Sequence, residues 1–229
     1  SQMKAITPDF SPRVIVSENI QTTIEEIKQS HPDTLVLYLL NKARFSDIGA
    51  INLYLAFDSM EKYSYGKTYS AVDIVTTSFN DNPDPLMKLL YCIVDLFRCY
   101  QFQKYGLIVQ TLRANKTLFC QDSWYIKEHR DKQILFNNLK VIFSVFEDET
   151  KTIGDLLTAL IDTSMVNNSY IEGVQADDEN RPVFDVPAIE LLRVIEYLND
   201  PKVSTQHGVK GESHDSVIFV AEDSRSNPI

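Results

Sequence analysis

The fold is decided by the stretch Val203-Ser204-Thr205-Gln206-His207-Gly208-Val209-Lys210-Gly211-Glu212-Ser213-His214-Asp215-Ser216-Val217-Ile218-Phe219-Val220. Its first part, 202–206, follows a proline and carries β-branched residues, which predicts a short strand. Its last part, 217–220, is an uninterrupted apolar run, typical of a fully buried strand of a parallel sheet. The polar loop between them would present backbone N–H groups, a cation and hydroxyls at one sheet edge. In open α/β sheets such an edge usually holds a phosphate-bearing ligand.

Two apolar runs near the N-terminus extend this sheet. Residues 13–17 (Arg-Val-Ile-Val-Ser) and 34–40 (Thr-Leu-Val-Leu-Tyr-Leu-Leu) predict strands, and the second is the clearest buried strand in the chain. Isoleucines at helical spacing predict a helix over 21–30, and a further helix is predicted over 45–60. The chain therefore opens β-α-β-α, which is typical of a parallel sheet with right-handed crossovers.

A mainly helical block separates the two ends of the chain. Apolar residues recur at helical spacing over 86–104, 124–146 and 152–165, and 106–112 continues the first of these helices or begins another. The acidic segment 167–187 is predicted to be a loop, and a helix is predicted over 187–199. The predicted fold class is therefore α/β: a parallel-sheet domain interrupted by an inserted helical subdomain.

The loop between the last two strands carries a pattern known from DNA helicases. Thr205-x-His207-x-x-Lys210-Gly211 resembles the fifth conserved motif of the UvrD/Rep/PcrA-like superfamily-one helicases, although the apolar residue that precedes the acid in that family is missing before Glu212. The resemblance implies that Thr205 and His207 contact the backbone of single-stranded DNA. It also implies that Lys210, Gly211 and Glu212 lie at the bound nucleotide, with Glu212 on the ribose side.

A second, partial similarity follows strand 34–40. Asn41 and Arg44 resemble the Asn and Arg of the family's Thr-Asn-x-x-Ser-Arg pattern, with the Ser missing. The resemblance makes them secondary candidates for contact with DNA or with the other motor domain of the enzyme.

The resemblance also implies a domain plan. Residues 1–62 and 185–229 would form two parts of the second RecA-like motor domain, and 63–184 the helical inserted subdomain. The phosphate loop, the magnesium motif and the first RecA-like domain would lie upstream, and the arginine-bearing last motif downstream. ATP and Mg would then be bound mainly outside this chain, and no catalytic residue is predicted within it. The expected parent protein is an ATP-dependent DNA helicase acting on single-stranded and duplex DNA.

Composition favours an alternative. The formal net charge is −10 and the pI is about 4.9, whereas a dedicated DNA-binding module normally presents a basic face. The alternative is a non-enzymatic protein-interaction module with an α/β base and a helical bundle. Strand order separates the two hypotheses, because the helicase hypothesis requires 13–17, 34–40, 202–206 and 217–220 to lie in one parallel sheet.

Other candidate sites in the sequence are weaker. Gly66-Lys67-Thr68 lacks the earlier glycine of a phosphate loop, since that position is Glu61. The loop residues His207, Glu212, His214 and Asp215 have no metal-site spacing, so no metal site is predicted. The three cysteines are scattered, which predicts reduced thiols in a cytoplasmic protein, and no apolar run is long enough to span a membrane.

Overall fold

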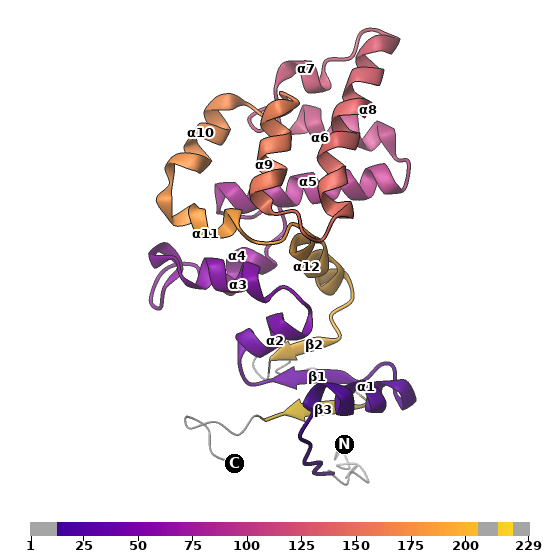
Figure 1. The fold of residues 1–229 in the computed structure, drawn as a ribbon, viewed down its shortest axis with the longest axis vertical. Helices are drawn as coiled ribbons and strands as arrows, with labels where there is room; N and C mark the ends of the chain where they lie inside the picture. The colour runs from indigo at the N-terminus through magenta and orange to yellow at the C-terminus, as the bar shows by residue number, and fades with distance from the viewer. Residues whose placement is uncertain (1–12, 206–214, 222–229) are drawn as a thin grey trace, which may run out of the picture.

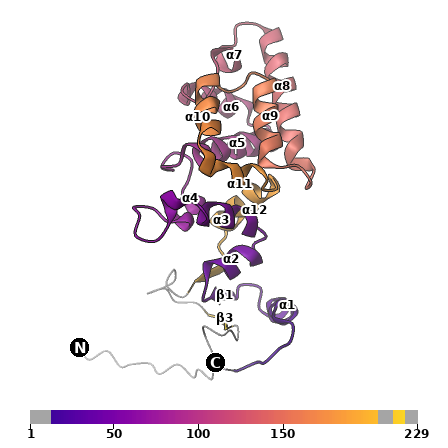
Figure 2. The same cartoon turned by 60° about the vertical axis from the view of Figure 1, so that its left-hand side comes forward.

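The structure is a computed structural model that describes residues 13–205 and 215–221. It is a mixed α/β protein in which a small parallel sheet lies at one end and most of the helices lie at the other (Figures 1 and 2). No helix in these two ranges is long and apolar enough to cross a membrane.

The sheet is built from three short parallel strands. They are β1 (Leu35–Tyr38), β2 (Val203–Thr205) and β3 (Val217–Val220), in the order β2-β1-β3. Val36 pairs with Val203 on one side and Ile218 on the other, so β1, the most buried of the three strands, takes the central position. Helix α1 (Ile20–Ser30), capped by Asn19, contributes Ile24 to the small core on this sheet. The predicted parallel sheet of these three strands is confirmed.

The predicted strand 13–17 is wrong. This segment forms no strand, and Val14 and Val16 are 91% and 95% exposed. β-branched residues favour a strand only where a partner strand and a packing surface exist, and 13–17 has neither among the described residues. The prediction that β3 is fully buried is also wrong, because Val217 and Phe219 are about half exposed.

The predicted helix 45–60 is two helices, α2 (Asn41–Asp47) and α3 (Ile51–Asp58). Gly49 lies between them with a φ of +70°, a left-handed conformation that interrupts the helix. Its carbonyl accepts a hydrogen bond from Nη1 of Arg193 at 3.0 Å, which ties the turn to helix α12 (Ile189–Asn199).

Replacing Gly49 with Ala is expected to lower the free energy of unfolding by about 1 kcal/mol, because a Cβ is strained at this φ. The added Cβ would also lie 3.2 Å from Cδ of Arg193. Urea denaturation followed by circular dichroism would measure the loss. Gly106→Ala is the control, since that glycine is helical with open space around it, and its variant should be neutral or more stable. Equal destabilisation of both variants would contradict the prediction.

The larger core lies among the helices that surround α5 (Pro85–Gln101). Nearly every side chain between Leu86 and Phe97 is buried, which is why this helix is apolar on most of its faces. Besides α5, the elements between α3 and α12 are η1 (Glu61–Tyr63), α4 (Ala71–Thr76), α6 (Tyr105–Ala114), α7 (Gln121–Trp124), α8 (His129–Phe143), η2 (Ser144–Glu147), α9 (Ile153–Asp162), α10 (Asn168–Ala176), η3 (Asp178–Asn180) and α11 (Arg181–Phe184).

The segment 167–187 is not the predicted loop, because it contains α10, η3 and α11. Ile171, Val174 and Val183 are buried in the helical core, but polar residues separate them widely enough to hide the helical pattern. Helices α3 and α12 also contribute buried side chains to this core. The domain boundaries at 62/63 and 184/185 stay a prediction.

Candidate functional site

The candidate site lies at the edge of the sheet that is formed by the C-terminal ends of the three parallel strands. Tyr38, the last residue of β1, pairs in register with Thr205 on β2 and Val220 on β3, so the three strands end side by side. Thr205 is half-buried at this edge. Asn41 begins α2 just beyond β1, and α2 packs against β2. The structure therefore brings Asn41, Arg44 and Thr205 into neighbouring elements.

Arg44 is the least expected residue of this site, because it is buried. It is only 7% exposed, and its guanidinium carbon lies 4.8 Å from the ring centroid of Phe45 and 5.8 Å from that of Tyr197. Its Nε and Nη2 have no hydrogen-bond partner among the described residues. The faces of aromatic rings stabilise a nearby cation, but they do not replace the hydrogen bonds to water that a guanidinium loses on burial. An unsatisfied buried guanidinium is a functional-site candidate on physical grounds.

The remaining predicted site residues cannot be placed. His207, Lys210, Gly211 and Glu212 lie outside the described residues. The two ends of their loop are placed: it leaves the sheet at Thr205 and returns before β3, on either side of the central strand.

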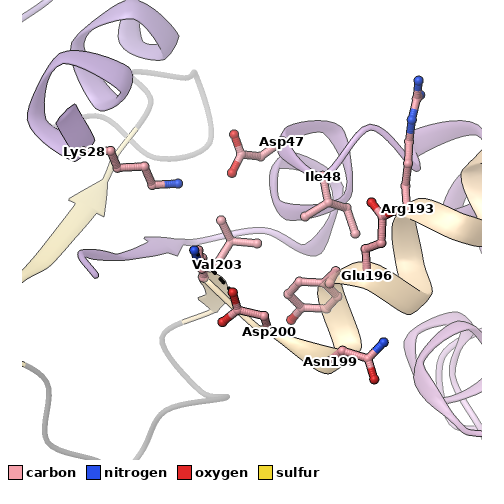
Figure 3. Close-up of a pocket in the computed structure, with 10 residues that line it drawn as sticks. Lys28, Asp47, Ile48, Arg193, Glu196, Asn199, Asp200 and Val203 are labelled. Atoms are coloured by element: carbon pink, nitrogen blue, oxygen red, sulfur yellow. Dashed lines mark ion pairs between the residues drawn. The ribbon is translucent and has the colours of Figure 1, made fainter. Parts of the chain in front are cut away.

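A cavity of about 540 Å³ lies where α2 and α12 end and β2 begins (Figure 3). Its charged lining is balanced: Lys28, Arg193, Lys202, Asp47, Glu196 and Asp200. Lys202 pairs with Asp200 at 3.2 Å, and Arg193 lies 3.6 Å from Glu149. Because Lys202 and Arg193 are paired with carboxylates, the cavity does not favour an anionic ligand. No local sequence pattern indicates this cavity, because its residues come from three segments that are far apart in the chain.

Tyr197 connects the cavity to the candidate site. It lines the cavity, and its ring also faces the guanidinium of Arg44. It belongs to the small core of the sheet together with Val36 and Val203. The ring therefore lies between the cavity and a buried cation.

A polar cluster that the sequence did not reveal lies at the start of α5. Nζ of Lys62 donates to Asp177 at 2.8 Å and lies 3.4 Å from the fully buried carboxylate of Asp84. Burial opposes the charge of Lys62, but its hydrogen bond to Asp177 and the nearby Asp84 raise its pKa overall. The hydrogen bond from Lys62 likewise lowers the pKa of Asp177. The cluster joins η1, α5 and η3, so we interpret it as structural.

Two further predictions can be compared with the structure. Gly66-Lys67-Thr68 lies in an exposed turn after η1 with no strand leading into it, so it cannot form a phosphate loop. Burial raises the pKa of the Cys92 thiol to about 12, as expected for an unreactive core cysteine.

Histidine, cysteine and acidic side chains form no metal-binding group within 13–205 and 215–221.

Comparisons with known proteins found no matching family model, no similar curated protein and no similar solved structure.

Proposed function

We propose that this chain is part of the second RecA-like motor domain, with its helical inserted subdomain, of a UvrD-like ATP-dependent DNA helicase. The observation that carries the proposal is the strand arrangement around the Thr205–Glu212 stretch. A central strand β1 is flanked by β2 and β3 in parallel, and the loop joining these two strands starts at the edge where β1 ends. That edge is where open α/β sheets bind phosphate-bearing ligands.

The positions of the described residues support this proposal. Thr205 is half-buried at the end of β2, and a threonine hydroxyl there can donate a hydrogen bond to a DNA phosphate. Asn41 and Arg44 are on the helix that leaves the same edge. One requirement of the helicase hypothesis is not met, because segment 13–17 forms no strand and lies outside the sheet. This counts against the proposal, which rests on the three strands β1, β2 and β3.

In the proposed mechanism, ATP and Mg bind mainly to the first motor domain, and this chain supplies the opposite wall of the cleft. Lys210, Gly211 and Glu212 face the nucleotide, while Thr205 and His207 hold the backbone of single-stranded DNA. Asn41, which is half-buried, would contact DNA or the other motor domain, whereas Arg44 is buried against Phe45 and Tyr197 and would support this surface from beneath. Closure and opening of the cleft during ATP hydrolysis then move the strand, and duplex DNA is unwound ahead of it.

His207→Ala in the longer parent polypeptide is expected to lower DNA-stimulated ATPase activity about tenfold, because one contact to the strand is lost. The ATPase activity without DNA should change little. Lys67→Ala is the control, since Lys67 is exposed and belongs to none of the predicted sites. The helicase proposal fails if the parent polypeptide has no phosphate loop upstream, or if His207→Ala leaves the stimulation by DNA unchanged.

The alternative of a protein-interaction module is favoured by one observation. Val217 and Phe219 on the edge strand β3 expose apolar side chains that a partner could cover. Two observations together would support this alternative. A partner protein would bind at β3, and the parent polypeptide would have no DNA-stimulated ATPase activity.

A further inference from the structure

The charge of this acidic chain is unevenly distributed. Residues 98–140 contain eight Lys and Arg residues and three acidic residues, a formal charge of +5. Because the whole chain has a charge of −10, the rest carries −15. This basic region spans α6, α7 and most of α8, which lie at the end of the molecule farthest from the sheet (Figures 1 and 2).

The cations of this region are not neutralised by ion pairs. All the ion pairs within the described part of the chain involve Lys or Arg residues outside 98–140. The carboxylate of Asp131 accepts hydrogen bonds from the backbone N–H groups of Lys127 and Glu128 and forms no ion pair with Lys127. These cations are therefore available to an anionic ligand.

Two aromatic rings lie among these cations. Nζ of Lys116 is 4.7 Å from the ring centroid of Trp124, and Nζ of Lys127 is 4.9 Å from that of Tyr125. The two ring centroids are 6.2 Å apart, and Nε of Arg113 donates to the carbonyl of Trp124 at 3.2 Å. We name these five residues the basic aromatic surface. Tyr125 is 47% exposed, and the three cations are exposed as well.

We propose that the basic aromatic surface binds single-stranded nucleic acid. Lysine and arginine side chains hold the phosphates of a strand, and an exposed aromatic ring stacks on an unpaired base. A duplex would use the cations but leave the tyrosine ring without a partner, because its bases are already stacked. The acidic remainder of the chain repels the strand elsewhere and so favours this end of the molecule. The inference does not depend on the helicase proposal.

The experiment measures binding of a fluorescein-labelled oligothymidylate of about 15 nucleotides to the chain by fluorescence anisotropy at several salt concentrations. Lys116→Glu/Lys127→Glu is expected to weaken binding about tenfold or more at low salt and to reduce the slope of log K against log salt by about 1.4. Tyr125→Ala, which removes an exposed ring without changing charge, should weaken binding roughly fivefold or more.

The matched control is Arg13→Glu/Lys67→Glu, which changes the net charge equally at two exposed cations outside this surface. It should bind nearly as well as the unchanged chain. Three results would overturn the inference: no binding by the unchanged chain at low salt, equal weakening by the control, or duplex binding as tight as oligothymidylate binding with no effect of Tyr125→Ala. The ATPase test at His207 involves none of these residues, so the two proposals can fail separately.

Discussion

Glu190→Ala is expected to lower the free energy of unfolding by about 3 kcal/mol. Glu190 is on the first turn of α12 and is 2% exposed. One carboxylate oxygen accepts the backbone N–H of Leu53 at 2.8 Å, and the other accepts Nδ2 of Asn52 at 2.7 Å. Helix α3 has no side-chain cap of its own, because the residue at its N-cap is Ala50. A carboxylate from a distant helix therefore caps α3, and its removal leaves a buried N–H unsatisfied.

Urea denaturation would measure this loss, with Glu196→Ala as the matched control on the same helix. Glu196 is exposed, so its replacement should change the free energy of unfolding by no more than about 0.5 kcal/mol. Glu190→Gln keeps an acceptor for the Leu53 N–H but loses the charge, so its stability should lie between those of the unchanged protein and Glu190→Ala. The structural role of Glu190 would be wrong if Glu190→Ala and Glu196→Ala were equally stable.

The strands show how far local sequence determines a sheet. Segments 34–40 and 217–220 are apolar runs and form β1 and β3, and 13–17 has a similar composition but forms no strand. The difference is not in the residues themselves, because a strand also needs a partner with free backbone groups. Pairing joins residues more than 160 positions apart, such as Val36 and Val203. Local β-propensity therefore predicted the three strands that form and one strand that does not form.

The helices were easier to predict where the apolar stripe was dense. Residues 86–104 were predicted helical and contain α5, whose inner positions are nearly all apolar. In contrast, the stripe of 167–187 is reduced to a few residues such as Ile171 and Val174, and acidic side chains dominate the segment. The break at Gly49 was missed because a glycine within an apolar pattern also occurs inside helices.

The candidate site was predictable in position but not in environment. The run 202–206 predicted a strand followed by a loop, so Thr205 was expected near the end of that strand, and the structure places it beside Tyr38. The burial of Arg44 depends on Tyr197 in a distant helix, and no local pattern contains that information. The same is true of Glu190 and Asp84, whose partners lie far along the chain or in another element.

Asp84→Ala is expected to lower the free energy of unfolding by about 3 kcal/mol or more. Its side chain is fully buried and serves three partners. Oδ1 accepts the backbone N–H of Met87 at 2.9 Å and so caps α5, while Oδ2 accepts the hydroxyl of Tyr63 at 2.6 Å and lies 3.4 Å from Nζ of Lys62. Alanine would leave the Met87 N–H and the Tyr63 hydroxyl without these acceptors. Lys62 would keep Asp177 as a partner, which limits the loss.

The comparison with Asp81→Ala isolates this effect, because Asp81 is in the same turn but exposed. Its replacement should change the free energy of unfolding by no more than about 0.5 kcal/mol. Asp84→Asn keeps an oxygen that can accept the Met87 N–H, but an amide NH2 group replaces the carboxylate oxygen that faces Tyr63 and Lys62. Because the helix cap is retained, this variant should be less destabilising than Asp84→Ala. If Asp84→Asn were as unstable as Asp84→Ala, the carboxylate oxygen that faces Tyr63 and Lys62, rather than the helix cap, would be the main contribution. If both Asp84 variants matched Asp81→Ala, the cluster would not stabilise the junction of η1, α5 and η3, and another contact would have to hold these elements together.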